Sequence, residues 1–164
     1  MSDLDRREAE QRLWDAIDDT RIGMLGLHEP GQHMQPMTAF CEPETNSIWF
    51  FTRRTTDLAR DAAGGREAMF CLISKDRKLY ACVGGRLQPS HDPERIERHW
   101  NPVVASWFSD GKDDPELTLL RLDADDAQIW LNEAGPIRFA WEVARGNLTD
   151  HQPDMGERAH VNFQ

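Results

Sequence analysis

The sequence contains no apolar run close to the roughly 20 residues that a membrane-spanning helix needs. Its first stretch, MSDLDRREAEQRLWDAIDD, is charged throughout and lacks the apolar segment of a signal peptide, so we expect a cytoplasmic protein with no membrane partner. Neither familiar phosphate loop is present, because no GxGxxG joins a strand to a helix and no GxxxxGK precedes a Ser or Thr. The formal net charge of −10 argues against a nucleic-acid partner, since phosphate backbones are bound by dense Lys and Arg.

Cysteine and histidine are few and widely spaced. The three cysteines, Cys41, Cys71 and Cys82, form no CxxC pair, so the sequence favours three buried free thiols over a metal or redox site. The six histidines form no HExxH or other tight ligand spacing, and we therefore expect no metal centre. A GxSxG elbow is also missing, so nothing indicates a hydrolase triad.

Short strand-like runs separated by turn residues fill the middle of the chain. The breaks HEPGQ and CEPETN predict hairpins between the first three runs. In the run Lys78–Pro89, Leu79, Ala81, Val83 and Leu87 alternate with more polar residues, which predicts one buried face. The sequence ADD predicts a turn between the last two strands. The predicted strands are Arg21–His28, His33–Cys41, Ser47–Thr52, Ala68–Ser74, Lys78–Pro89, Leu117–Asp123 and Ala127–Leu131.

Helices are predicted at the ends of the chain and between strands. An amphipathic pattern predicts an N-terminal helix over 3–19, with Ala9, Leu13, Ala16 and Ile17 on its apolar face. A second helix begins at Thr55 or Thr56 and ends at Gly64-Gly65, and a third begins at the N-cap and proline of Asp92-Pro93. A last helix is indicated by Ile137, Ala140, Trp141, Ala144 and Leu148, and the polar tail after it is expected on the surface or on a partner subunit.

Antiparallel strands with short helices in their connections predict a mainly β protein, a closed or partly closed β-barrel with flanking α-helices. A chain of 164 residues, 39% hydrophobic and 29% charged, fits one soluble domain covering 1–164. We expect the barrel over about 20–131 and a C-terminal helix and tail over 137–164.

Three segments carry candidate binding chemistry. In IWFFTRRTTDLARDAA, a strand is followed by Arg53, Arg54 and a helix start, which together could bind a phosphate, although the spacing alone favours Thr capping and solvated arginines. In HMQPMTAF, Pro36 removes a backbone donor and predicts an edge strand that could face a planar ring. The stretch WNPVVASWFSDGKDDPE predicts an aromatic wall or ordinary core packing.

Four segments in this order, HMQPMTAF, IWFFTRRTTDLAR, KLYACVGGRL and RHWNPVVASWFSDGKDDPELTLLRLDADDAQIW, resemble the pyridoxamine 5′-phosphate oxidase-like split-barrel flavoproteins. Within them the chain is similar to the bacterial general stress protein branch. The resemblance covers about Arg21 to Trp130, its most specific part is the WNP…GKDDP block, and the tail PDMGERAHV also resembles that branch.

The resemblance implies a six-stranded antiparallel split barrel and a homodimer with FMN at the subunit interface. It implies flavin-ring contacts at Gln35, Pro36, Met37 and Thr38. It implies phosphate and ribityl contacts at Phe51, Thr52, Thr56, Asp57 and Leu58, and a ring contact from Trp107 of the second subunit.

Two positions depart from the family pattern. The family often has Arg where this chain has Gln35 and Lys where it has Leu58, and both changes remove positive charge near the phosphate. Either Arg53, Arg54, Arg60 or the helix start compensates, or the site binds FMN weakly or takes FAD or another flavin.

Two functions remain open at this point. One is an FMN-dependent oxidoreductase that acts on an unidentified small molecule, with His33, Tyr80 and His99 as candidate proton donors. The other is a non-catalytic stress protein that stores, buffers or senses flavin. Oxidation of pyridoxamine phosphate needs a basic pocket for a second phosphate, and Arg138, Arg145 and Arg158 are scattered among acidic residues, so we do not expect that reaction.

Overall fold

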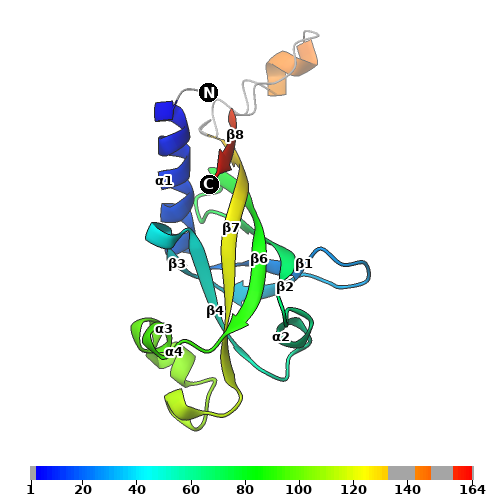
Figure 1. The fold of residues 1–164 in the computed structure, drawn as a ribbon. Helices are drawn as coiled ribbons and strands as arrows, with labels where there is room; N and C mark the ends of the chain where they lie inside the picture. The colour runs from blue at the N-terminus through cyan, green and yellow to red at the C-terminus, as the bar shows by residue number, and fades with distance from the viewer. Residues whose placement is uncertain (1–2, 133–142, 149–156, 164) are drawn as a thin grey trace.

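The computed structural model describes residues 3–132, 143–148 and 157–163. In these residues, eight antiparallel strands form one curled sheet with the order β2-β1-β5-β6-β7-β4-β3, and β8 pairs with β7 (Figure 1). β2 also contacts β4, which brings the two sides of the sheet together as a split barrel. The strands are β1 (Ile22–Leu27), β2 (Gln35–Thr38), β3 (Phe40–Glu42), β4 (Ser47–Arg53), β5 (Arg66–Ile73), β6 (Leu79–Ser90), β7 (Leu117–Leu131) and β8 (Glu157–Asn162).

The helices flank the sheet. The longest, α1 (Asp3–Thr20), stands beside the upper part of the sheet in Figure 1, while α3 (Pro93–His99) and α4 (Pro102–Ala105) lie at the lower end. α2 (Asp57–Asp61) follows β4, and residues 143–148 are also helical. Among the described residues, no helix combines the length and the apolar character needed to cross a membrane.

The apolar core fills the inside of the curled sheet beneath α1. Leu13 and Ile17 of α1 are fully buried there, against residues such as Phe50 and Phe70 whose rings meet edge to face at 5.3 Å. The predicted N-terminal helix and its apolar face are therefore confirmed. So is the alternation of β6, where Leu79, Ala81, Val83 and Leu87 are all buried.

A second, smaller apolar cluster lies on the opposite side of β4 and β7, beneath α3 and α4. Because side chains alternate across a strand, β4 supplies Phe50 to the first cluster and its neighbours Trp49 and Phe51 to the second. The cluster consists of Phe40, Trp49, Phe51, Ile96, Val104, Phe108, Leu117 and Leu119, with Trp100 packed against it.

The local caps that the sequence predicts are present. The Thr56 hydroxyl accepts a hydrogen bond from the Ala59 amide at the start of α2, and the Asp92 carboxylate accepts one from the Arg95 amide at the start of α3. The HEPGQ and CEPETN hairpins also form, since β1 pairs with β2 and β3 with β4.

The predicted strand count and two boundaries are wrong. The six strands implied by the resemblance are eight in the described residues. The ADD sequence makes no turn, because Asp125 is the extra residue of a β-bulge opposite Gly84 and Gly85, and β7 continues through it. A side chain at Gly85 would collide with the carbonyl oxygen of Asp123, so glycine permits this close approach.

The run His33–Cys41 is not one strand. It divides at Ala39, because β2 pairs with β1 and β3 pairs with β4. The sequence predicts a polar tail on the surface or on a partner subunit, yet residues 157–162 form β8 with Ala159 and Val161 buried against β7. The predicted positions Ile137, Ala140 and Trp141 lie outside the described residues.

Candidate functional site

β2 forms one side of the candidate site and is an edge strand, as Pro36 predicts. It pairs only with β1, in a register that sets Gln35 opposite Leu25 and Pro36 opposite Met24. Gln35 and Thr38 are half-buried, Pro36 is exposed, and Met37 packs against the barrel core. An edge strand leaves backbone N–H and C=O groups free on its outer side. This side of the site can therefore bond the rim of a planar ligand.

The end of β4 and the start of α2 form the opposite side. Phe51 is buried in the second apolar cluster, while Thr52 is half-buried beside Thr56. The Thr56 hydroxyl donates to the Arg53 carbonyl at 3.0 Å, so in the 3.3 Å contact between the two threonine hydroxyls Thr52 is the donor. The two hydroxyls thus sit together where the strand passes into the helix.

The arginines around this point differ in how they are paired. Arg53 contacts the Glu116 carboxylate at 2.5 Å and the Trp107 carbonyl at 2.6 Å, and its guanidinium lies 5.6 Å from the centre of the Phe108 ring. Arg60 contacts the Asp57 carboxylate at 2.5 Å.

Arg54 instead contacts a histidine, His91. Its Nη2 lies 3.3 Å from Nδ1 of His91, and within the described ranges it makes no carboxylate contact. Since Arg cannot give up its proton, it donates to Nδ1, which places the hydrogen of a neutral His91 on Nε2. Of these three arginines, Arg54 is the one whose positive charge no described carboxylate neutralises, so it is the most available to an anionic ligand.

Leu58 and Trp107 complete the list of predicted positions. Leu58 is buried at 6% exposure in the barrel core and offers no charge, while Asp57 is exposed and faces Arg60. Trp107 is 38% exposed, and its carbonyl ties the α4 segment to Arg53 in the same chain. β2 thus contacts β4, and the Arg53 hydrogen bond joins the Trp107 carbonyl to the end of β4.

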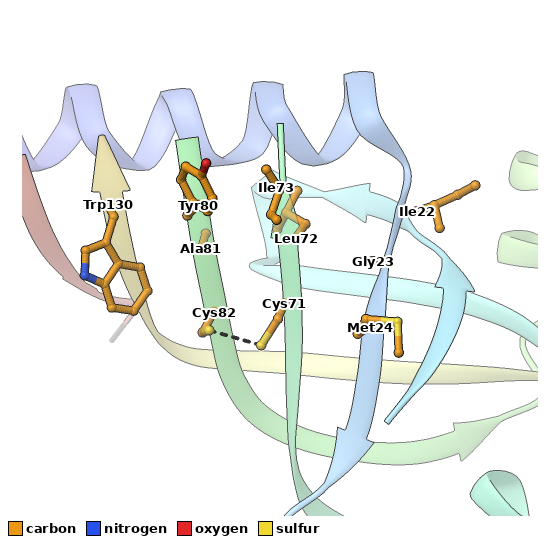
Figure 2. A pocket seen from close by; sticks show the side chains of 10 residues that line it. All are labelled: Ile22, Gly23, Met24, Cys71, Leu72, Ile73, Tyr80, Ala81, Cys82 and Trp130. Carbon is orange, nitrogen blue, oxygen red and sulfur yellow. Dashed lines mark hydrogen bonds between the residues drawn. The ribbon is translucent and has the colours of Figure 1, made fainter. Parts of the chain in front are cut away.

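A wide apolar hollow borders this site on the outer side of the sheet. It has a volume of about 680 Å³ and is lined by side chains of β1, β5, β6 and β7, as Figure 2 shows. Five of its large side chains are exposed by more than a third: Ile22, Met24, Ile73, Tyr80 and Trp130. Such a contiguous apolar patch is rare on a monomer and marks a contact surface.

The thiols are half-buried rather than buried, and two of them form a pair that the sequence did not reveal. Cys71 and Cys82 lie opposite each other on β5 and β6 with their sulfurs 3.0 Å apart. Burial and the hydrogen bond to Cys82 raise the pKa of the Cys71 thiol to about 12. Burial raises the pKa of the Cys41 thiol to about 11. Eleven residues separate the pair, and only the β5–β6 register shows that they meet.

Sequence reasoning also missed a buried carboxylate that holds α3 against the sheet. Glu42 is 2% exposed and accepts from Arg98 at 3.0 Å and from His99 Nε2 at 2.9 Å, with Arg95 at 3.5 Å. His99 is therefore a partner of Glu42, and Tyr80 lies on the apolar hollow. The sequence signal for this buried carboxylate is Glu42 itself, a charged residue at the end of the short apolar strand FCE.

Comparison with known proteins identifies the family. The family model described as "Pyridoxamine 5′-phosphate oxidase like" matches residues 8–154, most of the chain. The chain belongs to this family. The resemblance read from the four sequence segments is thereby confirmed, and so is the split-barrel fold, which solved members share.

Relatives within the pyridoxamine 5′-phosphate oxidase-like family are general stress proteins. A candidate general stress protein 26 from Jannaschia sp. CCS1 is 35% identical, with a TM-score of 0.79 over 96% of this chain and 99% of that one. The general stress FMN/FAD binding protein of Xanthomonas citri is 43% identical, with a TM-score of 0.73 over 79% of this chain and 92% of that one. General stress protein 26 of Bacillus subtilis is 25% identical over 77% of this chain and 91% of its own length.

Proposed function

We propose that this chain is a flavin-binding protein of the general stress type. It binds FMN in preference to FAD, in a site at the interface of a homodimer. The observation that carries the proposal is that β2, an edge strand of the described sheet, contacts β4, and that the Thr52–Thr56 hydroxyl pair and Arg54 lie at the end of β4. Membership of the family and the FMN/FAD binding relative at 43% identity support it.

The residues present fit the phosphate end of a flavin nucleotide. Two threonine hydroxyls lie beside the first turn of α2, where backbone N–H groups have no acceptor within the helix. Arg54 adds a positive charge that no described carboxylate neutralises, which offsets the missing lysine at Leu58. A dianionic phosphate gains from the Arg54 guanidinium and these amides, and from the Thr52 hydroxyl once it turns from Thr56 to the ligand, whereas an uncharged ribityl end gains nothing from the charge.

The ring end fits the edge strand. The Gln35 amide can donate to or accept from the polar rim of an isoalloxazine, and the free backbone groups of β2 can do the same. Met37 supplies an apolar contact from the core side. Since an amide carries no charge, we expect the flavin at this position to be held by hydrogen bonds and stacking.

The apolar hollow supports a homodimer with the flavin at its interface. It begins at the strand next to the site, because Ile22 and Met24 of β1 are the register partners of Thr38 and Pro36. A second copy that covers Ile73, Tyr80 and Trp130 removes this apolar area from water and at the same time walls the open side of the β2 edge.

For activity we propose an oxidoreductase that acts on an unidentified small molecule. When bound, FMN supplies the electron transfer, and the chain binds it, orients it and excludes water. The alternative is a non-catalytic flavin-binding stress protein. Of the candidate proton donors, Tyr80 lies on the apolar hollow and His99 pairs with Glu42, whereas His33 is exposed two residues before β2. Reduction of the bound flavin by NADH or NADPH and reoxidation by an added acceptor separate the two.

The visible spectrum of the purified protein tests flavin binding. After addition of excess FMN and desalting, we expect the protein to keep a yellow chromophore. A protein that stays colourless contradicts the proposed function.

Arg54→Ala tests the phosphate assignment. We expect about tenfold weaker FMN binding, roughly 1.4 kcal/mol, with riboflavin affinity nearly unchanged, because riboflavin has no phosphate. Lys75→Ala is the matched control, since it removes an exposed positive charge in the β5–β6 turn, where Lys75 pairs with Asp19 at 3.4 Å. Fluorescence titration measures all four affinities, and equal losses for both ligands would remove Arg54 from the phosphate site.

A further inference from the structure

Cys71 and Cys82 stand directly opposite each other in the β5–β6 ladder. Their sulfur atoms are 3.0 Å apart, with the Cys71 thiol donating to the Cys82 sulfur. Figure 2 shows the two side chains pointing toward each other between neighbouring strands, on the outer side of the sheet. Cys41, on β3, has no such partner, because its sulfur contacts the Trp14 carbonyl at 4.0 Å.

The surroundings of the pair are apolar. Met24 is the register partner of Cys71 on the other side, and Ile73, Tyr80 and Trp130 line the same hollow. No described carboxylate or cation contacts either sulfur, so nothing ties the thiols to an ion pair or a metal site. In the single chain both cysteines are half-buried at the hollow, so a small reagent reaches them from that side, and more slowly when the proposed second copy covers it.

We propose that Cys71 and Cys82 form a dithiol–disulfide site that hydroperoxides oxidise reversibly. One thiol attacks the peroxide oxygen, giving a sulfenic acid and releasing water or an alcohol. The second thiol then attacks that sulfur, the S–O bond breaks, and a second molecule of water leaves as the S–S bond forms. Altogether the two thiols give up two electrons and two protons, and the peroxide O–O bond is reduced.

The closeness of the second sulfur decides the product. Sulfenic acids go on to irreversible sulfinic and sulfonic acids unless a thiol traps them first. At 3.0 Å the partner is already in place, and intramolecular reactions between positioned groups have very high effective concentrations. The pair therefore stops at the disulfide, whereas Cys41 has no trap.

The site should also be easy to reduce again. Residues directly opposite in an antiparallel ladder keep their Cβ atoms about 4.5–5.5 Å apart, whereas a disulfide draws them to about 3.8 Å. Closing the bond must pull β5 and β6 together, and disulfides under such strain belong to the labile class. Because burial keeps Cys71 protonated at neutral pH, oxidation should become faster as the pH rises.

Native oxidation followed by peptide mapping tests the proposal. The folded protein is treated with hydrogen peroxide, blocked with iodoacetamide and digested with trypsin, which cleaves at Lys75, Arg77 and Lys78 between the two cysteines. We expect a cross-linked pair of peptides containing Cys71 and Cys82, lighter by two hydrogen atoms, with Cys41 outside the link. Dithiothreitol should restore both thiols.

Variants sharpen the outcome. Cys41→Ser should form the link as the wild type does, while Cys71→Ser and Cys82→Ser should form at least tenfold less, with Cys82→Ala as a second version of the latter. Circular dichroism checks that each variant is folded. The proposal is overturned if the native wild type forms no such link, if the link includes Cys41 or joins two chains, or if it forms only after unfolding in urea.

Discussion

The outer side of the sheet is apolar in two regions, and the described residues cover only one of them. Across β4 and the first half of β7, the helices α3 and α4 bury Trp49, Phe51 and Leu119 almost completely. Across β1, β5, β6 and the second half of β7, Tyr80 is 38% exposed and Trp130 is 42% exposed. Both regions have aromatic residues on strands of the same sheet, so strand sequence alone does not distinguish them.

The covered region shows what a complete interface in this protein looks like. Polar groups fix its cover in place: Glu42 holds Arg98 and His99 of α3, and Arg53 holds the α4 segment through Trp107. The open region has the apolar surface without the cover. An apolar face of this kind fits a partner surface, and the second copy that we propose would cover it and also wall the site beside β2.

A pair of tryptophan substitutions should produce the largest difference between the regions. Trp49 is 1% exposed and lies between the guanidinium groups of Arg95 and Arg121, at 5.3 and 5.4 Å from the ring centre. Trp49→Ala should lower the free energy of unfolding by about 3–5 kcal/mol. Trp130→Ala should lower that of the monomer by less than about 1 kcal/mol, because its ring is already partly in water. Urea denaturation measures both, and similar losses would show that the two regions do not differ.

A charge placed in the open region should separate the copies without unfolding them. Trp130→Asp puts a carboxylate into the apolar face, and we expect at least a tenfold weaker association of the homodimer, about 1.4 kcal/mol or more. Leu148→Asp is the matched control, since Leu148 is 84% exposed outside the hollow. Light scattering over a dilution series gives the masses. Unchanged association in Trp130→Asp, or an equal loss in the control, would move the interface elsewhere.

The alkylation rates of the cysteines should show a smaller effect of covering the hollow. In the proposed homodimer the second copy covers Cys71 and Cys82, so their alkylation by iodoacetamide should be several-fold slower than in Trp130→Asp. Cys41 lies on β3, outside the hollow, and should react equally in both proteins. Mass spectrometry of the labelled peptides measures all three rates, and identical rates at the pair would place it outside the contact.

The pH dependence of Cys41 alkylation is the smallest expected effect. Its raised pKa of about 11 means that the reactive thiolate is a small fraction at neutral pH. The alkylation rate should rise about tenfold per pH unit from pH 7 to beyond pH 9, which is the ordinary pKa of a free thiol. The rate of the same cysteine in the urea-unfolded chain should level off near pH 9. A native rate that levels off with the unfolded one would contradict the effect of burial.

Local chemistry explains which parts of the fold the sequence predicts. The caps at Thr56 and Asp92 depend on residues three positions away, and the alternation of β6 depends on one strand. The bulge at Asp125 and strand β8 depend on distant partners, Gly84-Gly85 and the edge of β7. A two-residue apolar pattern such as Ala159 and Val161 becomes a strand only where that edge is available.

The same division holds for the site. The family resemblance predicts residues 35–38 and 51–58 because they are contiguous motifs, and the structure brings the two motifs together across the barrel. The resemblance does not reveal that Arg53 is bonded to the Glu116 carboxylate and the Trp107 carbonyl, whereas Arg54 has no described carboxylate partner. The partners of Arg53 come from beyond residue 100 and are not part of the motif. The Cys71–Cys82 pair likewise requires the register of β5 and β6.

Sedimentation of the protein with FMN, followed both by protein absorbance and by the visible absorbance of the flavin, tests the central proposal most directly. We predict that the colour and the protein sediment together at twice the chain mass of 18.9 kDa, and that Trp130→Asp gives a colourless species at the chain mass. Colour that travels with the 18.9 kDa species, or a dimer that stays colourless in excess FMN, would contradict a flavin site completed by a second copy.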